Sequence, residues 1–404
     1  MTGWSRSRPA RYSKWFRVLS FPIKPPGMCQ RRGLLIGVSS AWLFAGPHLT
    51  KGSSAESTLN DITSRYKAAE AQQVDINEWK NHTNESGSVA WNTSYLLNSY
   101  VEMYEVTHNR EYLHKFEVLA DKLLEQTDAK RGLKDMNGRS RIGWSSTAYG
   151  SGKPRLVYLV HSAMITYPMA RFAELVKKSR ELGDLDDRAK AYRRIAESAM
   201  REFDEDWRYD TATREGSYVF SKGNPLGRPS AKETPVPFNM ELAAGRVFIS
   251  LYNVTSDGSY REKARALAQH FKDNLHLDPS GGYLWNYSTV SYSRSTIPPP
   301  PAAEDVGHSQ TDVDFAVLAA QNGIVFTRSD LQPFVKSYFR FAASVQKVDD
   351  RVLLDLWMPL SWGSCTIFQA IYPPLISEPL QKVFLNALSE AALYADKCSS
   401  KTNQ

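Results

Sequence analysis

The feature that most constrains the fold is a helical hairpin whose sequence occurs twice. Tyr104 recurs as Tyr252, 148 positions later, and further identities at the same offset continue as far as Ala120 and Ala268. In both copies, apolar residues recur every three or four positions on either side of a short polar turn, which is the pattern of two helices joined by a tight turn. We therefore predict that pairs of helices are the building unit of the chain.

Similar patterns predict five helix pairs along the chain. Their helices span residues 91–107 and 111–126, 155–180 and 186–203, 238–255 and 260–276, 305–326 and 329–345, and 365–372 and 378–397. Strand signals are few, at residues 216–220 and 281–287.

Helix pairs must stack to bury their apolar faces, either as an open solenoid or as a closed ring. The pairs begin at irregular intervals, whereas open solenoids keep a period of ~34–47 residues. Long connections rich in Gly, Pro and aromatic residues lie between the pairs, at 127–154, 204–237 and 277–304. We predict an all-α fold, an (α/α) toroid or barrel of helical hairpins with a minor β-hairpin in its loops, formed by residues 56–404 as a single domain.

The net charge of +7 is unevenly distributed. Residues 1–55 hold nine Lys and Arg and no acidic residue, which leaves 41 basic against 43 acidic residues in positions 56–404. A slightly acidic body removes the main argument for a nucleic-acid partner.

The basic N-terminal segment has the form of an export signal. Arg31 and Arg32 precede an apolar run at 34–45, which is too short to span a bilayer and suits a signal peptide better than a stable membrane anchor. Residues 30–35 resemble a twin-arginine signal, although general secretion fits equally well, and Met28 is an alternative start. We predict an exported protein, periplasmic or secreted; the alternative is a disordered basic tail.

Cysteine usage and missing motifs exclude several classes of protein. Only Cys365 and Cys398 follow the predicted signal, and they form either a disulfide or two buried thiols. The chain lacks a P-loop, a GxGxxG motif, a nucleophile elbow and an HExxH motif. We expect no cofactor and no metal ion, and the sequence leaves the oligomeric state open.

The body of the chain, at about residues 60–397, resembles the (α/α) toroid carbohydrate-active enzymes, which include polysaccharide lyases, uronyl epimerases and six-hairpin glycosidases. The resemblance rests on the hairpin rhythm, the aromatic-rich loops, the aromatic stretch at 281–287, and the segment from Glu304 to His308 that opens a predicted helix. An Asn-Asn-His run known from lyases of this fold is absent, so no specific family is indicated. The resemblance implies a polysaccharide or oligosaccharide substrate and a site at the starts of the inner helices.

Two of four candidate clusters lie in the first half of the chain. Trp91 and Asn92 open a predicted helix, where they either stack on and hydrogen-bond a sugar or serve as a core residue and a cap. Tyr158 and His161 share one face of an apolar helix. His161 is either a core histidine or a general base.

The third cluster follows a proline-rich loop and contains Asn239, Glu241 and Arg246. Asn239 and Glu241 either cap the positive end of a helix or line a cleft.

The fourth cluster carries Asp305, His308 and Asp312 in the first two turns of a helix that follows four prolines. The spacing places acid, imidazole and acid on one stripe, where a carboxylate raises the pKa of His and fixes its tautomer. The alternative is a capping residue and a solvated first turn.

These clusters lead to three functional hypotheses. The first is an exported polysaccharide lyase that cleaves a uronate-containing glycan by β-elimination. In this hypothesis, Asn92, Asn239 or Arg246 neutralises the uronate, and His161 or His308 takes the proton. Tyr158 or Tyr283 protonates the leaving oxygen. The sugar subsites are lined by Trp91, Trp285, Trp357 and Trp362.

The second hypothesis is a glycoside hydrolase of the same fold, with Glu241 and either Asp305 or Asp312 as its two carboxyl groups. The third is a non-catalytic glycan-binding helical protein.

Overall fold

A computed structural model describes residues 83–149, 152–221, 223–227, 232–279, 281–289 and 306–327, with short pieces between 63 and 70 and between 329 and 337. All of these residues belong to one unit of the fold, residues 51–393. The predicted export signal, Asp305, Trp357, Trp362, both C-terminal cysteines and the last helix pair lie outside the described residues. The expectations attached to them stay predictions.

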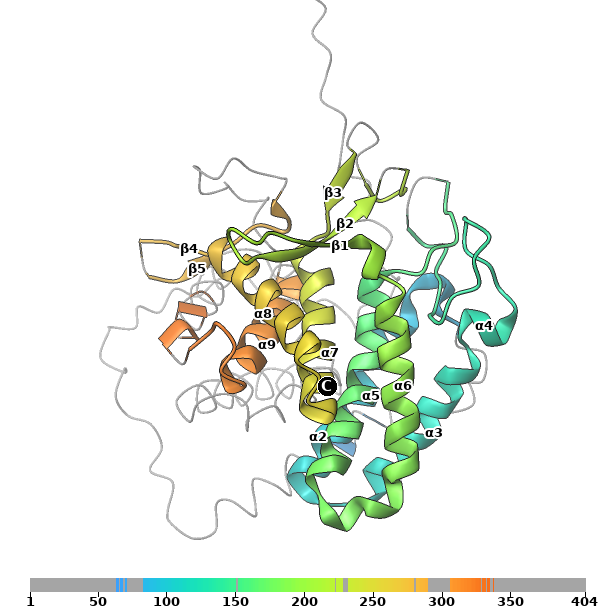
Figure 1. Cartoon of the computed structure of the whole chain (residues 1–404). Helices are drawn as coiled ribbons and strands as arrows, with labels where there is room; N and C mark the ends of the chain where they lie inside the picture. The colour runs from blue at the N-terminus through green and yellow to red at the C-terminus, as the bar shows by residue number, and fades with distance from the viewer. Residues whose placement is uncertain are drawn as a thin grey trace, which may run out of the picture. The chain divides into compact units, whose positions relative to one another are not determined.

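Within the described part of the chain, four helices form an inner layer in chain order. They are α2 (Ser94–Thr107), α5 (Leu159–Lys178), α7 (Phe238–Thr255) and α9 (Val306–Gln321). Helix α5 packs against α2 on one side and against α7 on the other, and α7 continues the layer to α9 (Figure 1).

Three helices form an outer layer, each paired with the inner helix that precedes it. These are α3 (Glu111–Glu125) beside α2, α6 (Asp186–Arg201) beside α5 and α8 (Gly258–Asp273) beside α7. The prediction of an all-α fold of the (α/α) type, built from helical hairpins, is confirmed. The bounds of α7 agree with the predicted range, and the other described helices begin or end within a few residues of theirs.

The repeated sequence forms the same turn in both copies. Helix α2 ends at His108 and α7 ends at Ser256, two non-glycine residues in the left-handed region with φ of 54° and 60°. The N–H of His108 donates to the carbonyl of Tyr104, and the N–H of Ser256 donates to the carbonyl of Tyr252, each at 2.7 Å. The equal offset in sequence therefore reflects an equal helix C-cap in structure.

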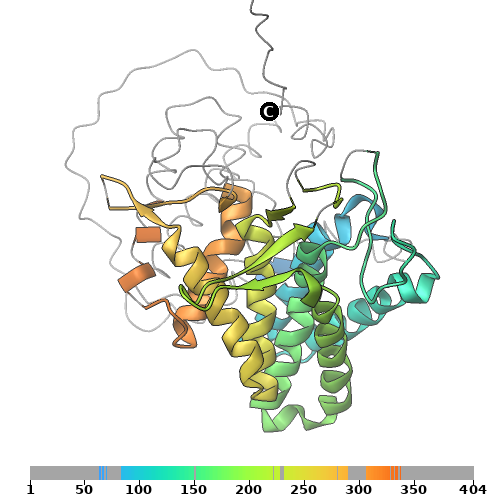
Figure 2. The ribbon, with the colours of Figure 1, turned by 45° about the horizontal axis from the view of Figure 1, so that its top comes forward.

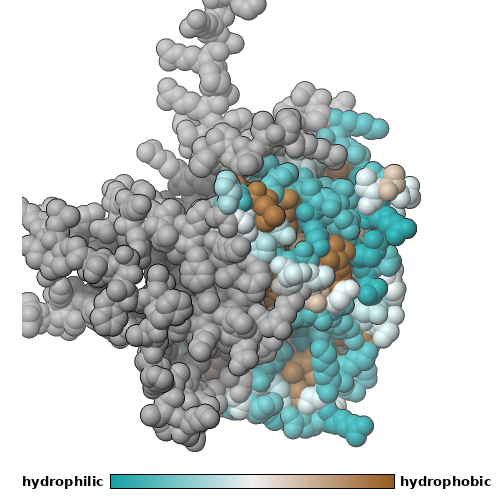
Figure 3. Space-filling model, turned by 90° about the vertical axis from the view of Figure 1, so that its left-hand side faces the viewer, coloured by the Kyte–Doolittle hydropathy of each residue, from teal (hydrophilic) through white to brown (hydrophobic). Residues whose placement is uncertain are grey.

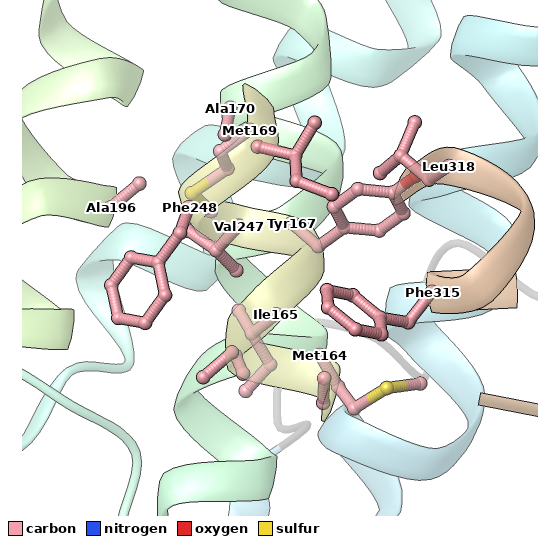
Figure 4. Close-up of a cluster of buried hydrophobic side chains, with 14 of the residues drawn as sticks. Met164, Ile165, Tyr167, Met169, Ala170, Ala196, Val247, Phe248, Phe315 and Leu318 are labelled. Atoms are coloured by element: carbon pink, nitrogen blue, oxygen red, sulfur yellow. The ribbon is translucent and has the colours of Figure 1, made fainter. Parts of the chain in front are cut away.

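Helices α2, α5 and α7 are buried on two faces because each contacts an inner neighbour as well as its outer partner. Helix α5 is buried without interruption from Leu159 to Ala173. Around it, Ile165 and Met169 meet Val247 and Phe248 of α7, together with Ala196 of α6 (Figure 4). The outer helices bury one face only, and the described surface in Figure 3 is mainly hydrophilic with separate small hydrophobic patches.

Small β elements lie in the connections between hairpins, as predicted. Strands β1 (Trp207–Tyr209), β2 (Gly216–Ser221) and β3 (Glu233–Pro235) form an antiparallel sheet in that order, and β4 (His276–Leu277) pairs with β5 (Tyr283–Leu284). The sheet leads directly into α7 (Figure 2). Between β3 and α7, the N–H of Val236 donates to the carbonyl of Tyr218 at 2.9 Å and holds this connection against β2.

Short helical segments complete the connections. They are η3 (Asn84–Ser86), the π-helical turn η4 (Val89–Thr93), α4 (Asp128–Arg131), η5 (Arg180–Leu185) and η6 (Asp204–Asp206). Segment η5 joins α5 to α6 at the lower end of Figure 1, whereas the β1–β3 sheet and the connection after α4 lie toward the upper end. Among the described residues, no helix combines the length and the apolar composition that crossing a bilayer requires.

Close approach of α7 and α9 depends on a glycine. A Cβ atom at Gly245 would overlap the ring of Phe315, which is fully buried against α7. The two inner helices can pack at this distance only because position 245 has no side chain.

We expect Gly245→Ala to destabilise the protein by about 1–3 kcal/mol, the usual cost of overpacking a core. Gly258→Ala is the matched control, since Gly258 also lies in a helix and a Cβ there meets no atom within 4 Å. Equilibrium unfolding in denaturant measures both variants. Equal stability of the two variants would contradict close packing at Gly245.

Candidate functional site

The N-terminal ends of the inner helices carry a cluster of rings that we call the aromatic rim. Its members are Trp91, Tyr149, Tyr158, His161, Tyr287 and His308. They come from η4, from the connections after α4 and β5, and from the starts of α5 and α9. Residues far apart in sequence thus meet at one end of the inner layer.

Trp91 lies between the two histidines of the rim. Its indole meets the ring of His161 at 5.7 Å and that of His308 at 6.4 Å between centroids, each time edge to face. The indole N–H donates to the hydroxyl of Tyr149 at 3.0 Å, which fixes the orientation of the ring. Gly87 lies beside the Tyr149 hydroxyl and has a φ of 81°. A Cβ atom at Gly87 would come within 2.6 Å of that hydroxyl.

His161 is enclosed at the start of α5 and is held in one tautomer. Nδ2 of Asn84 lies 3.0 Å from Nδ1 of His161 and also donates to the carbonyl of Trp144 at 2.8 Å. An amide nitrogen only donates, so Nδ1 accepts and the ring proton sits on Nε2. Burial lowers the pKa of His161 to about 3, so the ring is neutral near pH 7 and a weak base.

Tyr158 and Asn92 occupy different surroundings at the same end of the fold. Tyr158 is buried at the N-cap of α5 with its ring 4.9 Å from that of His161, and burial raises the pKa of its hydroxyl. Asn92 lies on η4 and is partly exposed. His308 is partly exposed, with its ring 5.3 Å from that of Tyr287.

Four other predicted residues lie in the core or, in the case of Tyr283, partly buried against it. Glu241 is fully buried, and its Oε2 accepts the N–H of Tyr218 at 3.0 Å. Asp312 is also fully buried and accepts the indole N–H of Trp285 at 2.9 Å. The rings of Trp285 and Tyr283 both pack against Phe334, at 5.5 and 4.9 Å.

The carboxyl of Glu241 faces α8 as well as β2. Burial, with a further contribution from the charge of Asp312, raises the pKa of Glu241 well above its usual range. Its Oε1 lies 3.8 Å from Nε2 of His270, whose Nδ1 lies 2.8 Å from Glu215. Asn239, in the same turn of α7, is buried, and its Oδ1 has no hydrogen-bond partner in the described part of the chain.

A second group of polar side chains lies farther along the inner helices. We call it the ionic layer, and its members are Glu102, Glu105, Arg171, Arg246 and Asp314. Arg171 of α5 donates to Glu102 at 2.8 Å and to Glu105 at 2.6 Å, both on α2. Arg246 of α7 donates to Asp314 of α9 at 3.2 Å, so the ionic layer joins α2 to α5 and α7 to α9.

The two most enclosed carboxyl groups of the ionic layer differ in acidity. Burial raises the pKa of Glu102 to about 8, and the nearby Arg171 offsets this only in part. Burial also raises the pKa of Asp314, to about 6, against the lowering effect of Arg246 and Arg171. Solvent reaches the layer, because Asp314 keeps 25% and Glu105 keeps 35% of its side chain exposed.

Besides the predicted residues in the core, the structure divides the others between two places. Trp91, Tyr158, His161 and His308 meet in the aromatic rim, whereas Arg246 belongs to the ionic layer.

Sequence reasoning missed Glu102, Arg171, Asp314 and Tyr149. A signal for Arg171 and Glu102 was present, because both are charged residues in apolar helical segments, where a charge needs a partner. No group of three or more His, Cys, Asp or Glu within the described residues is arranged to hold a metal ion.

Comparisons with known proteins bear on the fold. No protein-family profile matches the sequence, and no curated protein matches it either. Among solved structures, the α-1,6-mannanase GH76A of Salegentibacter sp. HEL1_6 is similar at 14% identity and a TM-score of 0.47, over 82% of this chain and 87% of that chain.

Two further solved structures are similar to the same degree. A family 76 glycoside hydrolase from a bovine Bacteroides thetaiotaomicron strain has 14% identity and a TM-score of 0.49, over 83% of this chain and 68% of that chain. The cellobiose 2-epimerase of Spirochaeta thermophila DSM 6192 has 16% identity and a TM-score of 0.43, over 80% and 87%. The fold itself rests on the described helices of this chain, whose paired inner and outer layers are of the (α/α) type that the helical hairpins predict.

Glu85 anchors the connection that carries Tyr149. Its Oε1 accepts from Arg155 at 2.7 Å and lies 3.5 Å from Arg131. Burial opposes ionisation, but the hydrogen bond from Arg155 and the charges of both arginines outweigh it and lower the pKa of Glu85. A lowered folded pKa contributes stability above the usual pKa of glutamate, and this contribution is lost as the pH falls through the folded value.

We expect Glu85→Gln to lower the melting temperature at pH 7 and to have a smaller effect at pH 3, closer to the lowered pKa at which the wild-type carboxylate takes up its proton. Thermal unfolding followed by circular dichroism at both pH values measures this. Glu125→Gln, at an exposed and loosely paired position, is the control. An equal effect of Glu85→Gln at both pH values would exclude a charge contribution.

Proposed function

We propose that this chain is a glycoside hydrolase that acts on a neutral glycan, with Glu102 and Asp314 of the ionic layer as its two carboxyl groups. The observation that carries the proposal is a layer between the inner helices in which two enclosed carboxyl groups are each paired with an arginine, at 2.8 Å for Glu102 and 3.2 Å for Asp314. Burial raises the pKa of Glu102 to about 8 and that of Asp314 to about 6. Glycoside hydrolysis needs one protonated and one ionised carboxyl at the working pH, and two environments that separate the pKa values provide this.

The hydrogen bonds of Glu102 favour the role of proton donor. Oε1 accepts from Arg171 and from the amide of Asn98 at 2.6 Å, whereas Oε2 has no hydrogen-bond partner among the described residues. The acidic proton therefore belongs on Oε2, from which it would pass to the glycosidic oxygen. Asp314, ionised above about pH 6, would act as the base or the nucleophile.

The pairing of the arginines supports a neutral substrate. Arg246 is paired with Asp314, and Arg171 with Glu102 and Glu105. Two guanidinium groups face three carboxyl groups, so this layer offers no excess positive charge for a uronate. The role that the sequence predicts for Arg246, neutralising a uronate, would require Asp314 to give up its partner.

The aromatic rim supports binding of sugars at the N-terminal ends of the inner helices. Trp91, Tyr149 and Tyr287 are partly exposed aromatic rings, and apolar or aromatic walls with a few polar groups are usual in small-molecule sites. The rim would bind the glycan while the ionic layer carries out the hydrolysis.

The purified chain should release reducing ends from at least one neutral glycan in a panel of α-1,6-mannan, β-1,4-glucan, xylan and chitin oligosaccharides. Polygalacturonate and alginate are the acidic comparison. Release of reducing ends only from the acidic glycans would contradict a neutral substrate, and no release from any glycan by the folded protein would contradict the hydrolase.

We expect Glu102→Gln and Asp314→Asn each to lower kcat by about 10²–10⁴-fold, the usual contribution of general acid or base catalysis. Asp121→Asn is the matched control, because Asp121 pairs with Arg188 at 2.7 Å on the outer layer, away from the inner helices. Melting temperatures show whether each variant folds. Wild-type kcat in either carboxyl variant would exclude that group from catalysis.

The second candidate is the lyase that cleaves a uronate-containing glycan by β-elimination. The observation that favours it is the position of His161 and His308 on either side of Trp91. The low pKa of His161 makes it a weak base, so His308 would take the proton. Ultraviolet absorbance of an unsaturated product from an acidic glycan, lost in His308→Gln, would favour the lyase over the hydrolase.

A further inference from the structure

Tyr167 of α5 lies between the two arginines of the ionic layer. The guanidinium carbon of Arg246 lies 4.6 Å from the centre of the Tyr167 ring, and that of Arg171 lies 5.9 Å from it. Both distances are within the range of a cation–π contact. Tyr167 itself is buried, next to Phe315 and Leu318 of α9 (Figure 4).

Few other contacts hold Arg246 in place. Its Nη1 donates to Asp314, its Nη2 lies 2.9 Å from the thioether of Met164, and its Nε has no hydrogen-bond partner in the described part of the chain. A thioether is a weak acceptor, so the ring of Tyr167 is the principal contact, apart from the carboxylate, that fixes the plane of the guanidinium.

We propose that Tyr167 is a positioning residue whose ring holds Arg246 against Asp314 and Arg171 against Glu102. The inference rests on the proposed function, because it concerns the same two carboxyl groups. It adds the reason why the pKa values of both carboxyl groups stay below what burial alone would give: each has an arginine held at a fixed distance by a shared ring.

The charged groups around Asp314 set the direction of the effect. Arg246 from α7 and Arg171 from α5 lower its pKa, and Asp314 in turn acts on Glu102 of α2. If the ring is lost and the guanidinium groups move away, the pKa values of both Asp314 and Glu102 rise. The acidic and basic limbs of the pH profile therefore move upward together.

The test compares the pH dependence of kcat/KM for Tyr167→Phe and Tyr167→Met on the neutral glycan that the wild type hydrolyses best. Tyr167→Phe keeps the ring, so both limbs of the pH profile should stay at their wild-type positions. Tyr167→Met fills the space without an aromatic face and should move both limbs upward by about one pH unit, the lower end of the usual effect of a paired arginine. In a Tyr167→Met and Arg246→Gln double variant, the acidic limb should move by less than the sum of the shifts in the two single variants, because both changes act on the pair of Arg246 and Asp314.

Two outcomes would overturn the proposal. Unchanged limbs with a lower plateau in Tyr167→Met would mean that Tyr167 only fills the core. Equal shifts in Tyr167→Phe and Tyr167→Met would assign the effect to the hydroxyl and not to the ring. If Tyr167→Met does not fold, phenylalanine with increasing numbers of ring fluorines at position 167 gives an isosteric series, and the limbs should move upward as the ring weakens as a cation partner.

A readout without activity separates this inference from the proposed function. The folded pKa of Asp314 is raised, so its protonated form contributes stability below the usual pKa of aspartate, and this is lost as the pH rises through about 6. A higher pKa of Asp314 in Tyr167→Met extends that loss of stability to higher pH. The free energy of unfolding of Tyr167→Met should therefore fall further below that of Tyr167→Phe as the pH rises from 4 to 8. A growing deficit in a protein that hydrolyses no glycan would refute the hydrolase alone, and a constant deficit would refute the positioning role of Tyr167.

Discussion

Burial of α5 on both faces is the constraint on which the described structure depends. Helix α5 lies between α2 and α7 in the inner layer and is covered by α6, so each of its first fifteen residues is buried. Any polar side chain on this helix must find its partner inside the protein, because an unpaired buried charge costs several kcal/mol. His161 meets Asn84 at one end of the buried stretch, and Arg171 meets Glu102 and Glu105 near the other. The polar contacts of α5 thus determine where both the aromatic rim and the ionic layer lie.

The two ends of the helical hairpins differ in the constraints on them. At one end, α2 and α7 close with the same left-handed cap, at His108 and Ser256, and this geometry is set by a few local residues. At the other end, the connections between hairpins differ in length and carry the small strands, the Tyr149 segment and the start of α7. Loops held by a rigid scaffold are where functional side chains usually lie. The aromatic rim follows this rule, whereas the ionic layer is built wholly from helical residues and is correspondingly rigid.

Part of the candidate site could be predicted from the sequence. The ends of the inner helices are the right region, and Trp91, Tyr158, His161 and His308 do meet there. The sequence did not predict that Arg246 pairs with Asp314, because the two residues lie on different helices and the pairing depends on how closely α7 approaches α9 at Gly245. Asp312 and Asp314 illustrate the same difficulty. They are two positions apart on one helix, which places them on different faces, and only the neighbouring helices decide that Asp312 meets Trp285 and Asp314 meets Arg246.

The sequence alone determined the class of fold: the periodicity of apolar residues and the repeated hairpin require helices in pairs, since each pair must bury an apolar face against the next. It also determined which segments become connections, because Gly, Pro and aromatic residues interrupt the helical pattern there. The tertiary structure alone decided which charges meet and how acidic they are. A pKa depends on distance and on burial, and both are set by neighbours that are 60 or more positions away in sequence, as with Arg171 and Glu102 or Arg246 and Asp314.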